Sequence, residues 1–415
     1  MKVLYVVGTN LSMNTSANIS HNAYVQGLFE NGCDVDILMS SSSWGEKDES
    51  LPIWPEANYY IYNSVSRVDK IKSIFKNTLD RRTSPAEISI TSKSGQEVVK
   101  STVTLKKAVR KLIKTTYDIV FKTTQLYHLD RTWLKNASSF KQKSRYDLII
   151  SNSSPASSHK LVLDLLAKKK LTDTRWIQIW EDPWYFDLYG GHSAEVRKEE
   201  HRLLKAGKEI FYVSTLTLHY QKKHFADCAH KMEHIPLPYL KINESKTVRK
   251  RNKVHFGYFG DYYAKTRNLQ PFYNALVAST AEGSINGDTD LALQSTNKIT
   301  VGGRVNLDKL SKLQDQTDVL VHLCNLHGGQ IPGKIYHYSA TEKPILFILD
   351  GTIQEKKIIK EYFKTFNRYH FCDNTEEEIL KTINKFLSGS ENFEERPVLD
   401  FAPQQVIKKL LKNNE

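Results

Sequence analysis

The sequence predicts an α/β protein made of two doubly wound domains, each a parallel sheet covered by helices. Three observations support this prediction. The chain has 415 residues, whereas domains of about 100–200 residues are usual. Short apolar runs alternate with stretches of helical apolar spacing from the N-terminus onward. The alternation begins again after residue 253, so we expect two sheets that face each other across a cleft.

The first series of elements occupies residues 1–245. Its first run, KVLYVV, is β-branched and aromatic, and the helical stretch after it stops at Asn31-Gly32. The predicted strands are residues 2–7, 34–39, 146–151, 175–180 and 209–214, and the predicted helices are 16–33, 157–170 and 196–207. Residues 40–60 are loop-like in composition. A basic insertion follows at about 65–145.

The second series occupies residues 252–395. Two prolines followed by polar and basic residues make 235–253 the predicted interdomain linker. The predicted strands are 254–260, 298–303, 318–323 and 344–349, and the predicted helix is 269–279. Residues 396–415 are expected to form a C-terminal helix that packs back on the N-terminal domain.

The formal net charge of +13 comes from one segment. Between Arg67 and Arg145 there are 19 Lys and Arg residues against 6 Asp and Glu residues, so the rest of the chain is balanced. Such a local excess favours an anionic partner. The four cysteines have no paired spacing, and the apolar run at the N-terminus is too short for a signal peptide. We expect free thiols and a cytoplasmic protein.

The stretch GGQIPGKIYHYSATEKPIL, residues 328–346, has the composition of a phosphate site. Glycines allow close approach to the backbone, and Pro332 suits the start of a helix whose first N–H groups have no evident side-chain cap. Lys334 adds a positive charge where the helix dipole is already positive. The alternative is an ordinary loop-to-helix connection with a solvated lysine.

This stretch resembles the donor-binding segment of glycosyltransferases with the GT-B fold, especially the retaining family 4. Residues 256–276 (FGYFGDYYAKTRNLQPFYNAL) are similar to the first strand, loop and helix of the same domain, and IQIWEDPW is similar to an acceptor-side strand and loop. The resemblance implies that the donor diphosphate and nucleotide are held by Gly260, Lys265, Arg267, Gly329, Gln330, Gly333, Lys334 and His337. For Lys265 and Arg267 the alternative is a solvated loop.

One departure from the family pattern concerns two positions. Family 4 usually has two glutamates there, the second of which holds the ribose, whereas this chain has Gly329 and His337. A neutral imidazole still offers hydrogen bonds to a ribose hydroxyl. His337 as a packed helix residue is the alternative.

Glu181 and Asp182 end a predicted strand, so they should face the cleft. Adjacent carboxylates suit an acceptor base or an orienting group. A turn cap before Pro183 is the alternative. The aromatic residues around the pair favour a role at a sugar, because rings pack on sugar faces as well as in cores; they are Trp180, Trp184, Tyr185 and Phe186.

Residues 103–125 have apolar side chains at helical spacing with basic residues mostly on the other side. The basic residues assigned to that side are Lys106, Lys107, Arg110, Lys111 and Lys114. Such a helix suits an anionic membrane surface. A helix packed on its own domain is the alternative, and nucleic acid has little support because no recognised module is present. The histidines of residues 219–234 lack any metal-binding spacing, so we expect a surface helix and no metal.

From the resemblance we expect a metal-independent, retaining glycosyltransferase without a cofactor. It would move a sugar from a nucleotide-diphosphate donor to a lipid-linked or glycan acceptor at the cytosolic face of a membrane, in polysaccharide or glycoconjugate synthesis. GT-B folds also host sugar epimerases. The competing hypothesis is a non-catalytic GT-B scaffold that binds a membrane or a partner, which Gly329 and His337 favour and the phosphate-type loops disfavour.

Overall fold

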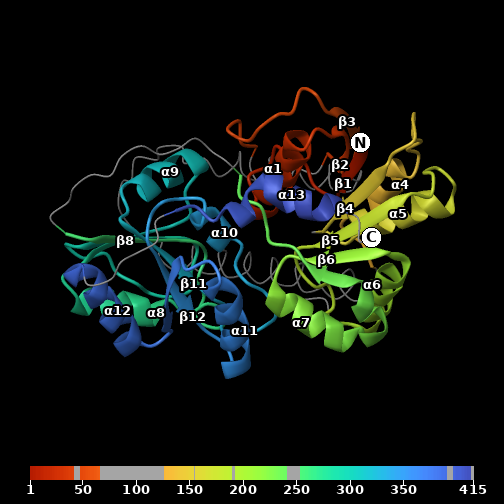
Figure 1. The fold of residues 1–415 in the computed structure, drawn as a ribbon. Helices are drawn as coiled ribbons and strands as arrows, with labels where there is room; N and C mark the ends of the chain where they lie inside the picture. The colour runs from red at the N-terminus through yellow and green to blue at the C-terminus, as the bar shows by residue number, and fades with distance from the viewer. Residues whose placement is uncertain are drawn as a thin grey trace, which may run out of the picture.

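The computed structural model describes residues 1–41, 47–65, 126–153, 155–188, 192–240, 253–389 and 396–412. Within them the chain forms two parallel sheets, each the centre of one domain (Figure 1). The sheet of seven strands belongs to the N-terminal domain and the sheet of six to the C-terminal domain. The predicted two-domain α/β fold is confirmed.

The N-terminal sheet has the order β3-β2-β1-β4-β5-β6-β7, and every pair of neighbours is parallel. Its strands are β1 (Lys2–Val7), β2 (Asp34–Ser40), β3 (Asn58–Tyr62), β4 (Leu148–Asn152), β5 (Arg175–Trp180), β6 (Glu209–Tyr212) and β7 (Met232–His234). The order reverses between β1 and β4, and ligands of doubly wound sheets bind at the carboxyl ends of strands at that position.

Helices cover both faces of this sheet. They are α1 (Ser16–Glu30), α4 (Arg131–Ala137), α5 (Ser157–Ala167), α6 (Ala194–Ala206), α7 (Thr215–His224) and the short 3₁₀ helix η1 (Ala226–Lys231). Alternate residues of a strand point to opposite faces. Thus Val3 and Val7 pack in one cluster with Leu28 of α1, while Leu4 packs in another with Trp133 of α4.

The C-terminal sheet has the order β10-β9-β8-β11-β12-β13 and is also parallel throughout. Its strands are β8 (His255–Phe259), β9 (Glu282–Asn286), β10 (Ile299–Gly302), β11 (Val319–Leu323), β12 (Ile345–Leu349) and β13 (Tyr369–Asp373). Its helices are α8 (Gln270–Ala278), α9 (Leu307–Asp315), α10 (Lys334–Tyr338), α11 (Ile353–Lys364) and α12 (Glu376–Ser388). The reversal here lies between β8 and β11.

The chain returns to the N-terminal domain at its end. After the 3₁₀ helix η2 (Leu399–Phe401), helix α13 (Pro403–Leu411) lies against α1 (Figure 1). A Cβ on Gly27 of α1 would clash with the carbonyl of Pro403, so glycine is what lets the two backbones approach. Arg175 donates to the carbonyls of Leu410, Leu411 and Lys412 at the end of α13.

The two domains share one apolar cluster. It contains Val7 of the N-terminal domain together with Ile335 and Phe347 of the C-terminal domain. The Tyr336 hydroxyl also donates a 2.9 Å hydrogen bond across the boundary to the carbonyl of Val213. The domains therefore meet through a packed interface next to the carboxyl ends of both sheets.

Several elements differ from the prediction. Residues 58–60, predicted as loop, begin β3, and β9 and β13 were not predicted. The predicted surface helix 219–234 is wrong beyond His224, because the chain there forms η1 and β7, which bury Cys228 and Met232. Near the end of the predicted basic insertion, Trp133 and Phe140 lie buried in the core.

The four cysteines are buried and free, as expected from their spacing. None of the helices that the structure describes is long and apolar enough to cross a membrane. The predicted amphipathic helix 103–125, with the basic residues assigned to its membrane side, lies outside the described residues.

Candidate functional site

Cationic side chains gather at the carboxyl edge of the C-terminal sheet. Lys334 begins α10, Arg267 lies in the loop after β8, and Arg304 lies in the loop after β10. Asp261, also in the loop after β8, is the carboxylate among them. We call Lys334, Arg267 and Arg304 the cationic cluster.

Lys334 reaches back across the sheet edge. Its ammonium donates to the carbonyl of Phe259, and a Cβ on Gly260 would lie 3.5 Å from Nζ. Burial lowers the pKa of Lys334 to about 8, with Asp261 acting to raise it and the cations Arg267 and Arg304 to lower it. A buried ammonium beside two guanidinium groups gains stability from a bound anion.

Arg267 is held in place from two sides. Its Nε and Nη2 donate to Asn325 Oδ1 at 3.1 and 2.8 Å, and its Nη1 donates to the carbonyl of Asp261 at 3.0 Å. Asn325 in turn donates to the carbonyl of Gln330 at 3.1 Å. The loops after β8 and β11 are thus tied together by one guanidinium.

Arg304 pairs with Asp261 and lies 3.7 Å from Asp288, and nothing in its local sequence pointed to a role. Lys265, which the resemblance placed on the diphosphate, is exposed in the same loop that holds Arg267. Its role stays a prediction, whereas the position of Arg304 is a new observation.

The glycines of the predicted phosphate loop contact protein. A Cβ on Gly328, whose φ is +90°, would lie 3.2 Å from Leu188, and one on Gly329 would lie 3.1 Å from Tyr220. A Cβ on Gly333 would lie 3.0 Å from Leu237. These three neighbours belong to the N-terminal domain, so the group that approaches the glycines closely is the other domain.

The helix that follows is short. α10 is five residues long and ends at Tyr338, and Gly333 at its N-cap provides no side-chain hydrogen bond. A longer helix was expected. A helix of about one and a half turns has a weak dipole. Most of the positive potential at this edge of the sheet therefore comes from the side chains of the cationic cluster. His337 is partly buried, and burial together with Lys334 lowers its pKa to about 4, so its imidazole is neutral at pH 7.

Asp182 faces the C-terminal domain. Its Oδ1 accepts a 2.5 Å hydrogen bond from Gln330 Nε2, and Gln330 Oε1 accepts one of 3.1 Å from the backbone N–H of Leu188. Burial raises the pKa of Asp182 to about 6, Gln330 acts to lower it and Asp187 to raise it. The hydrogen bond between Gln330 and Asp182 joins two loops that the sequence analysis predicted separately, one for the acceptor and one for the donor.

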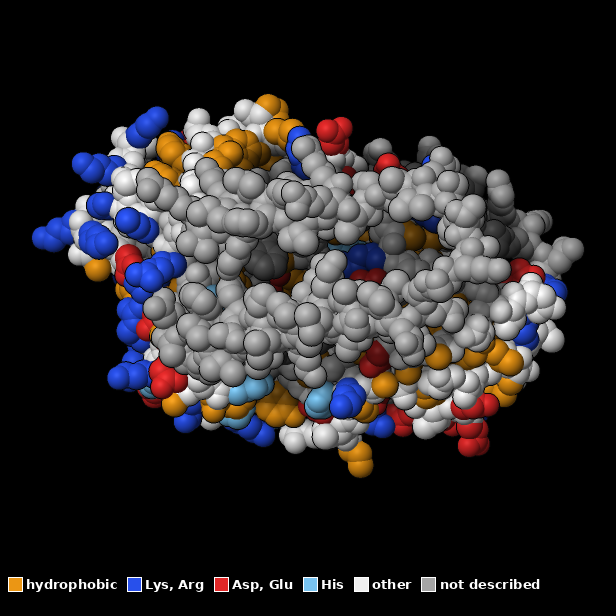
Figure 2. Space-filling view, turned by 180° about the vertical axis from the view of Figure 1, so that it is seen from behind, with side chains coloured by type: hydrophobic (Ala, Val, Ile, Leu, Met, Phe, Trp, Pro, Cys, Tyr) orange, Lys and Arg blue, Asp and Glu red, His pale blue; other side chains and the backbone are white. Residues whose placement is uncertain are grey.

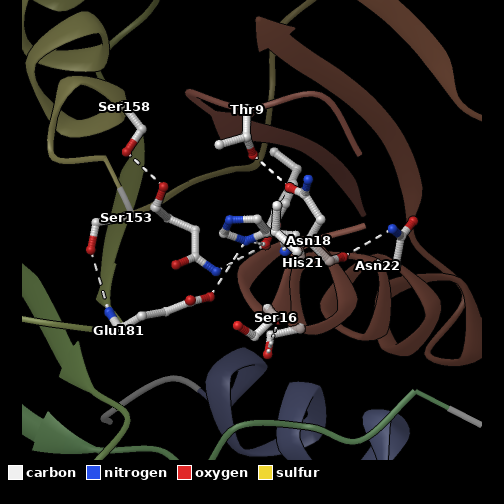
Figure 3. Close-up of polar contacts among 12 residues, drawn as sticks. Thr9, Ser16, Asn18, His21, Asn22, Ser153, Ser158 and Glu181 are labelled. Carbon is white, nitrogen blue, oxygen red and sulfur yellow. Dashed lines mark hydrogen bonds and ion pairs between the residues drawn. The ribbon is translucent and has the colours of Figure 1, made fainter. Parts of the chain in front are cut away.

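Glu181 points into the N-terminal domain, toward α1 (Figure 3). Its backbone N–H donates to Ser153 Oγ at 3.3 Å, and its Oε1 lies 3.6 Å from His21 Nδ1. Burial, and then the charge of Asp182, raises the pKa of Glu181, and burial lowers that of His21 to about 3. Burial therefore favours the neutral form of both groups.

Buried polar atoms around Glu181 have no hydrogen-bond partner among the described residues. They are His21 Nε2, Glu181 Oε1, Asn152 Oδ1 and the Tyr24 hydroxyl. Such atoms are rare in folded proteins because each one carries a desolvation cost. They lie at the carboxyl ends of β4 and β5 and on α1, where a doubly wound sheet binds its ligand. Sequence analysis missed His21, Asn152 and Tyr24, since each sits inside an ordinary strand or helix pattern.

The aromatic residues near the carboxylates divide into two groups. Trp180 is fully buried in the core, where its Nε1 donates to Gln178, so the expectation that it flanks a sugar is wrong. Phe186 lines a cavity between the domains. The loop between Trp180 and Phe186 is held by the buried carboxylate of Glu200. This carboxylate accepts hydrogen bonds from the backbone N–H groups of Trp184 and Tyr185 at 3.2 and 2.8 Å.

One group of residues in the described part of the chain has metal-ligand chemistry. His201, Asp227 and Cys228 have donor atoms within 4.8 Å of one another. His201 Nε2 already bonds Asp227 at 2.9 Å, and Lys205 Nζ lies 3.4 Å from the same carboxylate. The cation of Lys205 competes with a metal ion for Asp227. No metal role follows from this group.

Basic side chains also gather on the surface of the N-terminal domain. Figure 2 shows Lys and Arg side chains concentrated at the left end of that view, the end of the N-terminal domain. The exposed basic residues that follow α4 and α5 include Lys141, Lys143, Arg145, Lys168 and Lys169. The first three are the described end of the basic segment.

No protein-family model matches the chain, and no curated protein sequence does. Solved structures do match. TarM shares 10% identity over 99% of this chain and 98% of that chain, with a TM-score of 0.54. HepE of Anabaena, solved in complex with UDP, shares 11% identity over 99% and 95% at 0.53. The lipopolysaccharide outer core galactosyltransferase WaaB shares 11% over 99% and 100% at 0.50. The chain has the GT-B fold.

Proposed function

We propose that this chain is a glycosyltransferase that uses a nucleotide-diphosphate sugar. The observation that carries the proposal is the cationic cluster at the carboxyl edge of the C-terminal sheet, with Asp182 held against the same loop by Gln330. HepE, which has a similar fold, was solved with UDP, and WaaB is a galactosyltransferase. A diphosphate is the anion that suits such a cluster, because guanidinium groups bind phosphate oxygens in a bidentate way.

The chemistry follows from these positions. On the retaining course that the resemblance implies, an acceptor oxygen forms a bond to the anomeric carbon on the same face from which the diphosphate leaves, as the bond from that carbon to the diphosphate oxygen breaks. The electron pair leaves with the diphosphate, where Lys334, Arg267 and Arg304 stabilise the added charge. Asp182 accepts the proton of the acceptor hydroxyl, since a carboxylate with a pKa of about 6 is ionised at pH 7 and still basic.

The remaining parts of the proposal rest on the sequence resemblance. The backbone of Gly260 and the side chains of Lys265, Gln330 and His337 would complete the donor site. Retention of configuration, independence of metal ions and a lipid-linked or glycan acceptor belong to the same proposal. Attachment to an anionic membrane through residues 103–125 belongs to it as well. The non-catalytic scaffold finds no support in the site, which keeps both cations and carboxylates in place.

Calorimetry of the full chain with UDP, GDP, ADP, CDP and dTDP tests the proposal first. We expect micromolar or tighter binding of at least one of them, and release of that nucleotide from its sugar derivative during turnover. Failure of all five to bind would contradict a donor site at the cationic cluster. Binding without any release from sugar nucleotides would instead favour the scaffold.

A further inference from the structure

The cavity that Phe186 lines is a pocket beside the Asp182–Gln330 pair. Its volume is about 250 Å³, and its lining comes from both domains. The lining residues used below are Pro183, Phe186, Tyr220, Gln221, His224 and Glu355. Pro183 follows Asp182 in the chain, and Gly329, which also lines the pocket, precedes Gln330. The pocket therefore begins next to the proposed base and shares no residue with the cationic cluster.

One wall of the pocket is built from aromatic rings. The rings of Phe186 and His224 stack with centroids 3.5 Å apart and planes 15° apart, and the ring of Tyr220 lies within 16° of the His224 plane. Burial, with Arg197 and Lys223, lowers the pKa of His224, so the ring is neutral at pH 7. Parallel, uncharged rings present a flat face to the C–H groups of a sugar.

Polar groups complete the lining. Gln221 is 1% exposed, and its Nε2 donates to Glu200 at 2.7 Å and to the Tyr212 hydroxyl at 3.2 Å. Its Oε1 has no hydrogen-bond partner among the described residues. Glu355 Oε1 accepts a 3.2 Å hydrogen bond from the Tyr220 hydroxyl, and its Oε2 accepts one of 2.7 Å from the backbone N–H of Thr352 in the capping box of α11. Each carboxylate oxygen has capacity for a further donor. The buried amide oxygen of Gln221 lacks a donor among the described residues, and the Glu355 carboxylate can accept a further hydroxyl or amide donor.

We infer that this pocket binds one sugar ring of the acceptor, so that the acceptor of the proposed glycosyltransferase is itself a saccharide. An aromatic wall, an unpaired amide oxygen and a carboxylate match the flat apolar face and the hydroxyl groups of a pyranose. Pockets for drug-sized ligands have about 300–1,000 Å³, so this smaller one suits a single ring. Its aromatic wall comes from the N-terminal domain, which also carries Asp182, the proposed base for the acceptor hydroxyl.

Saturation-transfer NMR on the full chain tests the inference with the methyl glycosides of glucose, galactose, mannose and N-acetylglucosamine. At least one glycoside should receive saturation, and saturating UDP should leave that signal in place because the two sites are separate. Phe186→Ala should weaken the binding about tenfold or more. Tyr185→Ala is the matched control, since Tyr185 lies on the same loop and packs edge-to-face on Phe186 but does not line the pocket.

Phe186→Tyr keeps the ring and should keep binding, which separates loss of the wall from loss of folding. The inference is overturned if no glycoside binds to the wild type, or if Phe186→Ala binds as tightly as Tyr185→Ala. The inference rests on the proposed function, but the two fail differently. A chain that binds UDP and no glycoside keeps its proposed function without this pocket, whereas glycoside binding without any nucleotide would remove the donor site and leave a sugar-binding pocket.

Discussion

Gln330 Nε2 donates a 2.5 Å hydrogen bond to Asp182 Oδ1, and the two residues belong to different domains. Gln330 lies in the loop that leads to Lys334, and Asp182 directly follows Glu181 at the end of β5. The contact therefore sets the distance between the proposed base and the proposed diphosphate site.

Asp182→Asn should reduce turnover at least about a hundredfold while leaving nucleotide affinity within about threefold of the wild type. The substitution is nearly isosteric and removes only the proton acceptor, which contributes roughly 10²–10⁴-fold in general base catalysis. Initial rates and calorimetry on the same preparations measure the two effects. Unchanged turnover would return Asp182 to the role of a turn cap.

The pH profile gives a second view of the same pair. Wild-type turnover should fall as the pH drops below about 6, where Asp182 takes up its proton. Gln330→Ala removes the hydrogen bond that holds this pKa down, so the acid limb should move to higher pH. An acid limb at the same pH in both proteins would show that Asp182 does not control the rate.

Lys334→Ala and Arg267→Ala should each weaken binding of a nucleotide diphosphate more than about tenfold. Hydrogen bonds to charged groups contribute about 1.5–3 kcal/mol, and 1.4 kcal/mol is a factor of ten. Lys312→Ala is the control, an exposed lysine of α9 in the same domain. Because the pKa of free Lys334 is about 8, binding at pH 8 should also take up protons. Calorimetry in two buffers of different ionisation enthalpy detects this uptake, which Lys334→Ala should abolish.

Glu181→Gln should make the protein more stable at pH 8 than the wild type, with a smaller difference at pH 5. The folded chain keeps the Glu181 proton above the pH of about 4.3 at which an unfolded glutamate releases it. The folded state then binds more protons, so the wild-type free energy of unfolding falls as the pH rises. Melting temperatures at both pH values measure this. Exposed Glu342→Gln is the control, and an equal response of both variants would contradict the raised pKa.

Gly328→Ala should destabilise the protein and also lower turnover. A side chain at positive φ costs roughly 1–2 kcal/mol, and here Cβ would also press on Leu188 at 3.2 Å. Gly32→Ala provides the matched control, because its φ is +72° and nothing lies within 4 Å. Both variants should melt at lower temperature, but only Gly328→Ala should slow the reaction. Equal activity of the two would mean that the loop tolerates a shift at the interface.

Replacing Lys106, Lys107, Arg110 and Lys111 with Gln should release the protein from anionic vesicles and leave nucleotide binding intact. Attachment by such residues is electrostatic, so salt should weaken it as well. Vesicle co-sedimentation measures it, with Lys309, Lys312, Lys357 and Lys360 replaced by Gln as a control of equal charge change on exposed positions. A wild type that stays in the supernatant at low salt would rule this helix out as an attachment site.

The fold class was predictable because apolar periodicity records burial. Strands such as β1 and β12 are buried on both faces, and their sequences are nearly continuous apolar runs. β9 was not predicted because its sequence, EGSIN, consists mostly of small and polar residues. A Cβ on Gly283 would lie 2.8 Å from Leu276 of α8, so the close packing of α8 on β9 explains why a glycine occupies this strand position. The glycine in turn weakens the strand pattern in the sequence.

The candidate site was predictable only where one short segment held several of its residues. Lys334 and Gln330 belong to a single motif, and Glu181 and Asp182 are adjacent. Arg304 carries no such signal, because what brings it to the site is the position of β10 at the edge of the sheet. The glycines of residues 328–333 were interpreted as open to a phosphate, whereas their neighbours across the domain boundary could be found only in three dimensions.

The return of the chain to α13 has a mechanical consequence. The polypeptide passes between the domains twice, and the two passages lie side by side where the backbone N–H of Tyr239 donates to the carbonyl of Phe401 at 3.1 Å. Two connecting segments side by side allow the domains to rotate about one axis, and they resist rotation of one domain relative to the other about the remaining axes. In a chain truncated before Pro403, a single covalent segment would join the two domains, and rotation about all axes would be less restricted. The donor and acceptor loops would then meet in many orientations, of which few bring Gln330 to Asp182.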